Sequence, residues 1–173
     1  MNIIKLIVFD VDGTLTNGGI TYHSDGSESK TFSSKDGLIL KELYKLEIST
    51  LFLTARDSKV VEDRGRYLKI TDILQNVSEK KSVLLEYADH KGISAESIAY
   101  IGDDLNDYAA MMVCGFKACP ADASSEIREI SDYVSKYNGG HGAVRDICEY
   151  ILRRQNQYKE FLALFGCKDT VLK

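Results

Sequence analysis

The sequence predicts an α/β fold in which a parallel sheet lies between layers of helices. Short apolar runs rich in β-branched residues alternate along the chain with stretches of helical period. The apolar runs are continuous rather than alternating with polar residues, which is typical of strands buried on both faces. Because parallel strands need crossover connections, the helices between them should cover both faces of the sheet.

Six short segments are predicted as strands. The first, residues 6–9, is an apolar run that ends in acidic residues, and the second covers residues 48–53. The remaining predicted strands are residues 73–74, 98–101, 116–119 and 133–134.

Helices are predicted between these strands from apolar residues at helical spacing. The first helix contains Ile39, Leu43 and Leu46. A later helix contains Val83, Leu84, Tyr87 and Ala88. The clearest apolar stripe consists of Val144, Ile147, Cys148, Ile151 and Leu152.

One segment, residues 17–32, interrupts the alternation. Residues 20–23 and 27–32 read as two strands of a hairpin that turns at Asp25-Gly26. The sequence leaves no room for a separate cap domain, so we expect a single domain over residues 1–173. Its C-terminal tail, residues 156–173, should form a short amphipathic helix that packs on the body or on a neighbouring subunit.

The composition is that of an ordinary globular chain of 173 residues, with 44% hydrophobic and 28% charged residues. The net charge of -4 gives no basic surface for nucleic acid or a membrane. The N-terminal segment lacks the length and cleavage site of a signal peptide, and the four cysteines show no metal-binding spacing. We therefore expect a cytoplasmic protein with buried free thiols.

Acidic residues follow two of the predicted strands. Asp10 and Asp12 follow the first strand, and Asp103, Asp104 and Asp107 follow the fourth. In an open α/β sheet these loops meet at one edge, where so many carboxylates repel one another unless a cation neutralises them. All-oxygen ligands suit Mg²⁺. A solvated acidic loop is the ordinary alternative for one such segment, but the two together favour catalysis.

These segments resemble the motifs of the haloacid dehalogenase superfamily. The resemblance lies in VFDVDGTLT, the strand ending LFLT, a downstream lysine and IGDDLND. It implies a Rossmann-like fold, and it implies phosphatase or phosphotransferase activity because members with this first motif typically have one.

The resemblance also implies the roles of individual residues. Asp10 would attack phosphorus to form an aspartyl phosphate, and Asp12 would act as general acid and then general base. Magnesium would bind Asp10, the backbone carbonyl of Asp12 and Asp103, with Asp104 and Asp107 in a supporting second shell.

Two further residues complete the implied catalytic set. Thr54 would donate a hydrogen bond to a phosphate oxygen, and Lys80 would balance the negative charge of the phosphate and of Asp10. Lys81 is an alternative to Lys80, because either lysine could be a solvated surface charge.

The match extends to a more specific family, the 3-deoxy-D-manno-octulosonate 8-phosphate (Kdo 8-phosphate) phosphatases. The resemblance covers residues 3–155, including 16–20, 30–37, 99–104 and 139–146. It implies a capless phosphatase of lipopolysaccharide biosynthesis. It also implies a homotetramer in which the hairpins associate and a neighbouring subunit helps to close the active site, which the C-terminal tail can reach.

The family's substrate contacts correspond to a small set of polar residues. The arginine guanidinium groups in this set can each bind the carboxylate of a sugar acid through two hydrogen bonds. The set comprises Asp12, Ser33, Ser34, Lys35, Asp36, Gly37, Arg56, Arg64 and Lys80.

Several residues depart from the family pattern, namely Lys35, Lys41, Ala55 and His141. Lysine lacks the bidentate fork of arginine, so a nine-carbon keto-deoxy sugar acid 9-phosphate remains an alternative substrate. Two other functional classes are alternatives to a hydrolase. A non-catalytic oligomerisation or phosphosugar-binding domain would not need both Asp10 and Asp12, and a phosphotransferase would have to exclude water without a cap.

Overall fold

The computed structural model describes residues 2–167 and contains a six-stranded sheet in the order β5-β4-β1-β6-β7-β8. All neighbouring strands in this sheet are parallel, which confirms the predicted α/β fold. The strands are β1 (Leu6–Phe9), β4 (Ser49–Leu53), β5 (Asp72–Leu74), β6 (Ile98–Ile101), β7 (Phe116–Cys119) and β8 (Tyr133–Val134). Part of the predicted tail, residues 168–173, lies outside the described residues, as does residue 1.

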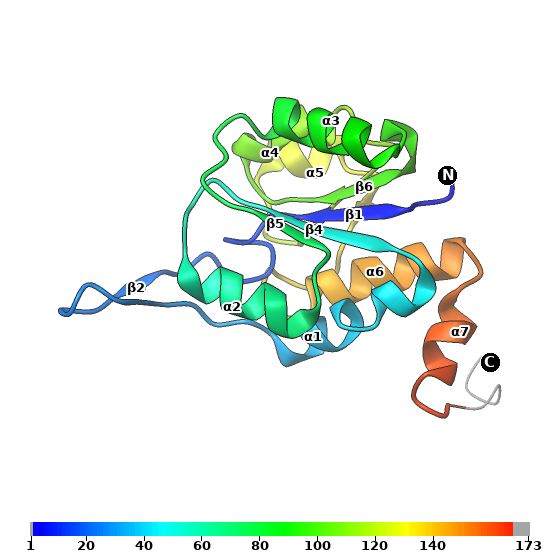
Figure 1. Ribbon diagram of the computed structural model, residues 1–173, viewed down its shortest axis with the longest axis horizontal. Coiled ribbons are helices and arrows are strands. Elements are labelled where there is room, and N and C mark those ends of the chain that lie inside the picture. The colour runs from blue at the N-terminus through cyan, green and yellow to red at the C-terminus, as the bar shows by residue number, and fades with distance from the viewer. Residues whose placement is uncertain (1, 168–173) are drawn as a thin grey trace.

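Helices cover both faces of the sheet, with α3, α4 and α5 on one side and α1, α2 and α6 on the other (Figure 1). The helices are α1 (Ser34–Leu40), α2 (Lys59–Leu68), α3 (Lys80–Lys91), α4 (Leu105–Met111), α5 (Ser125–Ile130), α6 (Ala143–Arg154) and α7 (Tyr158–Ala163). Two short 3₁₀ helices, η1 (Leu43–Leu46) and η2 (Ala95–Ser97), precede β4 and β6.

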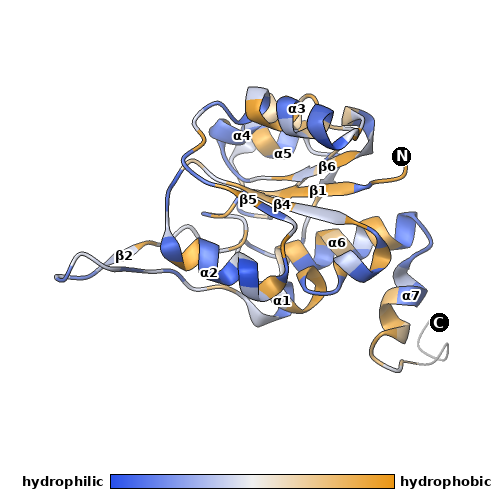
Figure 2. Ribbon diagram, in the orientation of Figure 1, coloured by the Kyte–Doolittle hydropathy of each residue, from blue (hydrophilic) through white to orange (hydrophobic). Residues whose placement is uncertain are grey.

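The alternation of side chains along β1 divides the core into two layers. Ile7 and Phe9 belong to one cluster with residues of α1, α2 and α6, whereas Leu6 and Val8 belong to the other with residues of α3, α4 and α5. Figure 2 shows β1 as hydrophobic, in contrast to the hydrophilic patches on the outside of α3. Since both faces of β1 are buried, its carboxyl end has a fixed position.

The predicted first helix is divided in two. It ends after Leu40, and the chain continues as η1. Leu43 and Leu46 are both buried, because residues three apart lie on one side of a 3₁₀ helix. The same apolar spacing therefore fits either helix type, and sequence spacing alone did not distinguish them.

The predicted hairpin is present but shorter than expected. It pairs β2 (Thr21–Tyr22) with β3 (Glu28–Ser29) in antiparallel register and projects from the body (Figure 1). Its turn is as predicted at Asp25-Gly26, where Gly26 has a φ of +85° and the Asp25 carboxylate accepts a hydrogen bond from the Ser27 amide at 2.9 Å. Such a small ribbon has little stability of its own.

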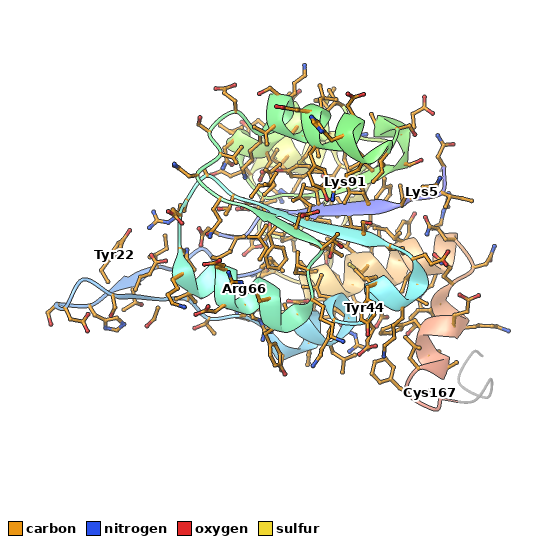
Figure 3. All side chains as sticks on the ribbon, viewed as in Figure 1. Lys5, Tyr22, Tyr44, Arg66, Lys91 and Cys167 are labelled. Atoms are coloured by element: carbon orange, nitrogen blue, oxygen red, sulfur yellow. The ribbon has the colours of Figure 1, made fainter. Side chains whose placement is uncertain are left out.

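The tail packs on the body through α7. Phe161 is 1% exposed and joins the core cluster that contains α6, whereas Phe165 is exposed. Three cysteines are buried free thiols as predicted, but Cys167 is exposed, at the end of the described tail (Figure 3). Among residues 2–167, no helix has the length and apolar character needed to cross a membrane.

Candidate active site

The acidic loops meet at the point where the strand order changes direction. From β1 the chain builds β4 and β5 on one side, and then returns to place β6 on the other side. Asp10 follows β1 and Asp103 lies two residues after β6, so both stand at the carboxyl ends of adjacent strands. In open α/β sheets this switch point is where ligands bind.

A buried ammonium joins two carboxylates at this edge. The Lys80 Nζ donates to Asp10 Oδ1 at 2.6 Å and to Asp107 Oδ1 at 2.7 Å. All three residues are at most 4% exposed. Lys80 is the first residue of α3, so a helix anchored in the core fixes its position, whereas the neighbouring Lys81 is exposed.

Burial and crowding shift the ionisation of these groups. Burial raises the pKa of Asp10 well above its usual range, Asp107 adds to this and Lys80 opposes it. Burial and Asp107 raise the pKa of Asp103 to about 6. Burial alone would lower the pKa of Lys80, but Asp10 and Asp107 outweigh it and raise that pKa. The edge therefore holds more negative charge than one ammonium neutralises.

The Asp103 loop is held against the loop after β1. The Thr14 hydroxyl donates to Asp103 Oδ1 at 3.0 Å, and the Asp103 amide donates to Asp107 Oδ2 at 3.1 Å. Gly13 has a φ of +98°, and a Cβ there would lie 2.0 Å from Asp103 Oδ2. Only glycine lets the two loops approach this closely.

The residues present fit a divalent cation. Carboxylate oxygens of Asp10, Asp103 and Asp107 lie within 4.8 Å of one another, and hard oxygen donors are the ligands that Mg²⁺ prefers. Asp107 already accepts from Lys80, Tyr100 and the Asp103 amide, so its oxygens are engaged within the protein. Its assignment to the second shell, and that of Asp12 to the first, stay predictions.

Asp104 does not belong to this group of clustered carboxylates. Its side chain is exposed and accepts a hydrogen bond from the Leu105 amide at 2.8 Å, at the start of α4. A carboxylate in this position stabilises the first turn of the helix. The predicted supporting role at the metal stays a prediction.

Asp12 lies between the hairpin and the loop after β4. Its Oδ1 pairs with the Lys30 ammonium, and its Oδ2 lies 3.8 Å from Arg56 Nε. Both Oδ2 and Nε are buried without a hydrogen-bond partner. Arg56 also contacts the hairpin, donating to the Tyr22 hydroxyl at 2.6 Å and to Glu28 at 3.4 Å.

Thr54 is buried directly after β4. It is 2% exposed, and its hydroxyl accepts a hydrogen bond from the Arg56 amide at 3.4 Å. The loop after β4 thus presents Thr54 and Arg56 beside the loop after β1, as expected for neighbouring parallel strands.

The predicted substrate segment at the start of α1 begins with contacts to α1 itself and to α2. Ser33 caps α1 by accepting from the Asp36 amide at 3.3 Å, and its carbonyl accepts from Arg64 Nη2 at 3.3 Å. The Arg64 guanidinium lies 5.6 Å from the ring centres of Phe32 and Tyr67. Together with Ser34 and Gly37, Arg64 lines a separate cavity of about 290 Å³.

Asp36 has a structural position. It is 1% exposed, and its carboxylate accepts from the amides of Gly142 and Arg145 at 3.3 and 2.8 Å, at the start of α6. Burial raises the pKa of Asp36, and these amide hydrogen bonds oppose the shift. Its role as a substrate contact stays a prediction.

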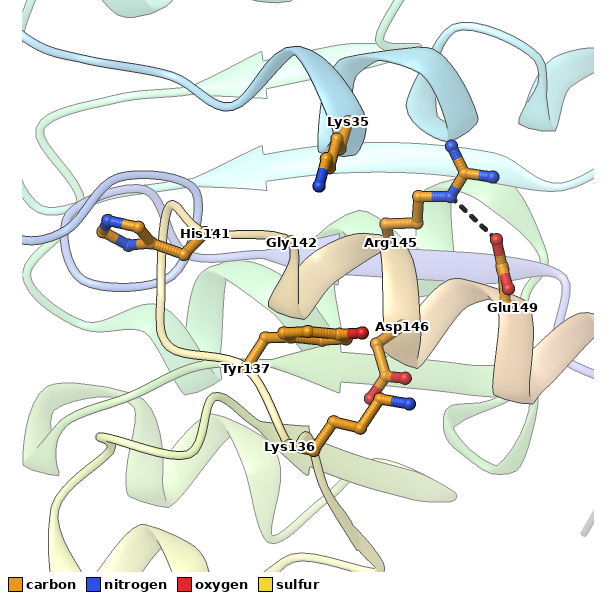
Figure 4. Close-up of a pocket in the computed structure, with 8 residues that line it drawn as sticks. All are labelled: Lys35, Lys136, Tyr137, His141, Gly142, Arg145, Asp146 and Glu149. Atoms are coloured by element: carbon orange, nitrogen blue, oxygen red, sulfur yellow. Dashed lines mark hydrogen bonds and ion pairs between the residues drawn. The ribbon is translucent and has the colours of Figure 1, made fainter.

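Lys35 points into another cavity, of about 340 Å³, beside the start of α6 (Figure 4). His141 and Arg145 line the same cavity, and Arg145 is paired with Glu149 at 2.8 Å. This cavity combines cationic and acidic side chains, so its lining does not select an anion by charge alone.

Sequence reasoning missed the residues that the hairpin brings to the site. Lys30 contacts Asp12, and Glu28 contacts Arg56 and Ser58. The position of the hairpin directly after the first acidic motif was the available signal. The sequence of such a short hairpin does not show which of its side chains point towards the site.

The chain matches known proteins in its sequence as well as in its fold. Residues 62–147 match the family model for haloacid dehalogenase-like hydrolases. The chain is 36% identical to the 3-deoxy-D-manno-octulosonate 8-phosphate phosphatase KdsC of Escherichia coli K12 over 157 residues, covering 91% of this chain and 84% of that protein.

Solved structures agree with the sequence match. A 3-deoxy-D-manno-octulosonate 8-phosphate phosphatase from Moraxella catarrhalis, in complex with magnesium, phosphate and KDO, is 40% identical, with a TM-score of 0.91 over 94% of this chain and 93% of that chain. The cobalt-bound enzyme from Haemophilus influenzae is 35% identical, with a TM-score of 0.87 over 91% of this chain and 92% of that chain. The chain therefore shares its family and fold with these two proteins, each of which was solved with a divalent cation bound.

Proposed function

Because the chain belongs to the Kdo 8-phosphate phosphatase family of haloacid dehalogenase-like hydrolases, we propose that it hydrolyses Kdo 8-phosphate to Kdo and inorganic phosphate. The activity is that of a phosphoric monoester hydrolase of lipopolysaccharide biosynthesis. The observation that carries the chemistry is the buried Lys80 held between Asp10 and Asp107, beside Asp103 at the switch point of the sheet.

In the first step, an oxygen of Asp10 attacks phosphorus and the bond from phosphorus to the sugar oxygen breaks. Asp12 gives its proton to the leaving alkoxide, so the products are Kdo, an aspartyl phosphate on Asp10 and an ionised Asp12. Asp10 suits this role because the rigid end of β1 holds it and Lys80 keeps one of its oxygens in place.

In the second step, water attacks the aspartyl phosphate. Asp12 takes one proton from that water, and the remaining hydroxyl oxygen bonds to phosphorus. The bond from phosphorus to Asp10 breaks, releasing hydrogen phosphate and returning both aspartates to their starting states.

The magnesium ligands of the proposal are Asp10, Asp103 and the backbone carbonyl of Asp12, supported by Asp104 and Asp107. When bound, the ion neutralises charge on the phosphate and polarises its oxygens. The raised pKa values of Asp10 and Asp103 support this assignment, because a cation relieves the crowding that causes them. Thr54 would donate to a phosphate oxygen, and Lys80 would offset charge on the phosphate.

Sugar recognition is assigned to Arg56 and Arg64, Lys80, Asp12 and residues 33–37. The Nε atoms of Arg56 and Arg64 are both buried without a hydrogen-bond partner, but Arg56 has the stronger geometric support because its Nε lies 3.8 Å from Asp12 Oδ2. An unpartnered buried guanidinium nitrogen is suited to the carboxylate or a hydroxyl of a sugar acid.

We propose that residues 1–173 form a single domain that acts as a cytoplasmic homotetramer. The exposed hairpin supports assembly, because within the described part of the chain its strands pair only with each other, and Tyr22 is 67% exposed. A neighbouring subunit over this edge would exclude water from the site, because the elements of residues 2–167 include no separate cap domain.

Phosphate release from Kdo 8-phosphate with magnesium tests the proposal. A nine-carbon keto-deoxy sugar acid 9-phosphate and nitrophenyl phosphate serve as competing substrates. We expect Kdo 8-phosphate to be preferred and Asp10→Asn to lower turnover by about 10⁴-fold or more. Asp63→Asn, the same change at an exposed position, should leave turnover unchanged.

The substrate panel separates the alternatives. Preference for the nine-carbon acid would retain the mechanism and overturn the substrate. Release of phosphate to an added sugar rather than to water would identify a phosphotransferase. No turnover of any substrate would contradict the enzymatic proposal and favour a binding or assembly domain.

A further inference from the structure

The side chain of Lys30 is buried against the carboxylate of Asp12. Lys30 directly follows β3, and its ammonium pairs with Asp12 Oδ1 while its side chain has no exposed surface. An ammonium that is removed from water needs a hydrogen-bond acceptor, because an unpartnered buried charge is very costly, and Asp12 Oδ1 can accept from Lys30 whether or not Oδ2 carries a proton. The contact therefore anchors the base of the hairpin at the site.

The two oxygens of Asp12 have different surroundings. Oδ1 accepts from Lys30, whereas Oδ2 is buried without a hydrogen-bond partner. The nearest cationic nitrogen to Oδ2 among the ion pairs of residues 2–167 is Arg56 Nε, at 3.8 Å, which is beyond hydrogen-bond distance. Oδ2 is thus the oxygen left for another partner.

This asymmetry determines where a proton can reside on Asp12. An ammonium has three donors and no acceptor, so a proton on Oδ1 would point at a group that cannot accept it. We propose that Lys30 is a positioning residue that confines the transferable proton of Asp12 to Oδ2. The proposal rests on the proposed function, in which Asp12 is the general acid and base.

One oxygen then serves both steps of the reaction. As the ester bond to phosphorus breaks, the Oδ2–H bond gives its proton to the leaving alkoxide, and the ionised Asp12 keeps its hydrogen bond from Lys30. When water attacks the aspartyl phosphate, Oδ2 takes the proton that the water loses. Lys30 remains an ammonium throughout, so no other proton donor or acceptor is needed.

The hairpin fixes both sides of this carboxylate. Lys30 holds Oδ1 directly, while Tyr22 and Glu28 hold the Arg56 guanidinium on the side of Oδ2. Glu28 also accepts from the Ser58 hydroxyl, which ties the hairpin to the start of α2. A change in the placement of the hairpin would therefore change the proton transfer and not only the shape of the site.

A comparison of leaving groups tests the proposal. General-acid help matters for alkyl esters and little for esters of acidic phenols, so kcat/KM is measured for Kdo 8-phosphate, glycerol phosphate and dinitrophenyl phosphate. We expect Lys30→Gln, whose amide can also accept a proton, to lower kcat/KM by about 10²-fold for the two alkyl esters and by less than about threefold for the dinitrophenyl ester. Lys30→Arg should restore most of the alkyl-ester rate, because it keeps a donor-only cation.

Matched variants identify the cause of any loss. Lys59→Gln makes the same change at an exposed lysine and should leave all three rates unchanged. In an Asp12→Ala background, Lys30→Gln should have no further effect on the alkyl esters. Lys30→Met provides the same test if Lys30→Gln does not fold.

Specific results would overturn the proposal. An equal loss for all three esters, or an added loss in the Asp12→Ala background, would show that Lys30 acts only on structure. Wild-type turnover of glycerol phosphate without turnover of Kdo 8-phosphate would overturn the proposed substrate and leave the Lys30 comparison intact. Absence of all three activities would overturn both.

Discussion

Two lysines hold the two aspartates of the first motif, and they come from very different parts of the molecule. Lys80 begins α3, is 2% exposed and joins Asp10 to Asp107. Lys30 comes from a two-stranded hairpin that projects from the body, and it contacts Asp12. The Asp10 side of the site is thus part of the core, and the Asp12 side depends on a ribbon with no core.

The difference predicts how stability and activity are coupled on the two sides. A change at Lys80 leaves buried charges inside the main domain, so folding and catalysis should fail together. A change in the hairpin alters contacts that lie outside both core clusters, so catalysis should fall while the domain remains folded. The two sides can therefore be separated by measuring both quantities for each variant.

The largest effect is expected from Lys80→Met. Removal of the ammonium leaves Asp10 and Asp107 buried without their common partner, which should lower the free energy of unfolding by about 3–5 kcal/mol. Phosphate release should fall by about 10³-fold or more, because the same change removes positive charge next to Asp10, the proposed nucleophile. Urea unfolding and steady-state kinetics measure the two losses.

Lys81→Met is the matched control for this variant. Lys81 is the adjacent residue, but it is exposed, so its loss should change the free energy of unfolding by less than about 0.5 kcal/mol. A stable Lys80→Met protein, or equal losses for both variants, would contradict the central role of the buried ammonium.

Magnesium is expected to have the next largest effect, by raising the free energy of unfolding through the carboxylates on the Asp10 side. Crowded carboxylates destabilise the folded state, and a cation that binds only that state at about 100 times its dissociation constant should add about 2.7 kcal/mol. Asp103→Asn should abolish most of this gain, because Asp103 is one of the clustered carboxylates and a proposed ligand. Thermal unfolding with and without magnesium measures the gain.

Asp104→Asn distinguishes a ligand from a nearby acid. Asp104 is exposed and bonded to the Leu105 amide, so the magnesium gain should persist in this variant. If Asp104→Asn loses the gain and Asp103→Asn keeps it, the ligands have been assigned to the wrong carboxylates.

The Asp10 side was predictable from the sequence and the Asp12 side was only partly so. Asp10 and Lys80 stand at the ends of elements that buried apolar residues specify, and their motif spacing is characteristic of a family. Chain order along a parallel sheet then places Asp10 and Asp103 together. Such positions follow from patterns that a sequence displays.

Contacts between irregular segments were not predictable in the same way. Lys30 lies next to Asp12 because the hairpin folds back, and no pattern of apolar residues in the sequence indicates that contact. The family resemblance predicts Asp36 as a substrate contact. In the structure its carboxylate caps α6 by accepting from the amide of Gly142, which lies 106 residues further along the chain. Long-range contacts of single polar side chains depend on tertiary packing, which local sequence does not specify.

The smallest effect is expected from Tyr22→Phe in the hairpin. Its hydroxyl accepts a hydrogen bond from Arg56, but the side chain is 67% exposed, so water can replace the lost contact. We expect kcat/KM to fall by about two- to fivefold and the free energy of unfolding to change by less than about 0.5 kcal/mol. Tyr44→Phe is the matched control, because its hydroxyl also accepts from a cation, Lys69, at 3.1 Å, but at an exposed position of η1.

This pair of variants decides whether the hairpin acts on catalysis through side-chain contacts. Loss of activity in Tyr22→Phe alone, at unchanged stability, would show that a contact made outside the core still reaches Asp12 through Arg56. Equal and small effects in both variants would limit the influence of the hairpin to Lys30. A large loss of stability in Tyr22→Phe would instead mean that the hairpin belongs to the same cooperative unit as the sheet, and the distinction between the two sides would fail.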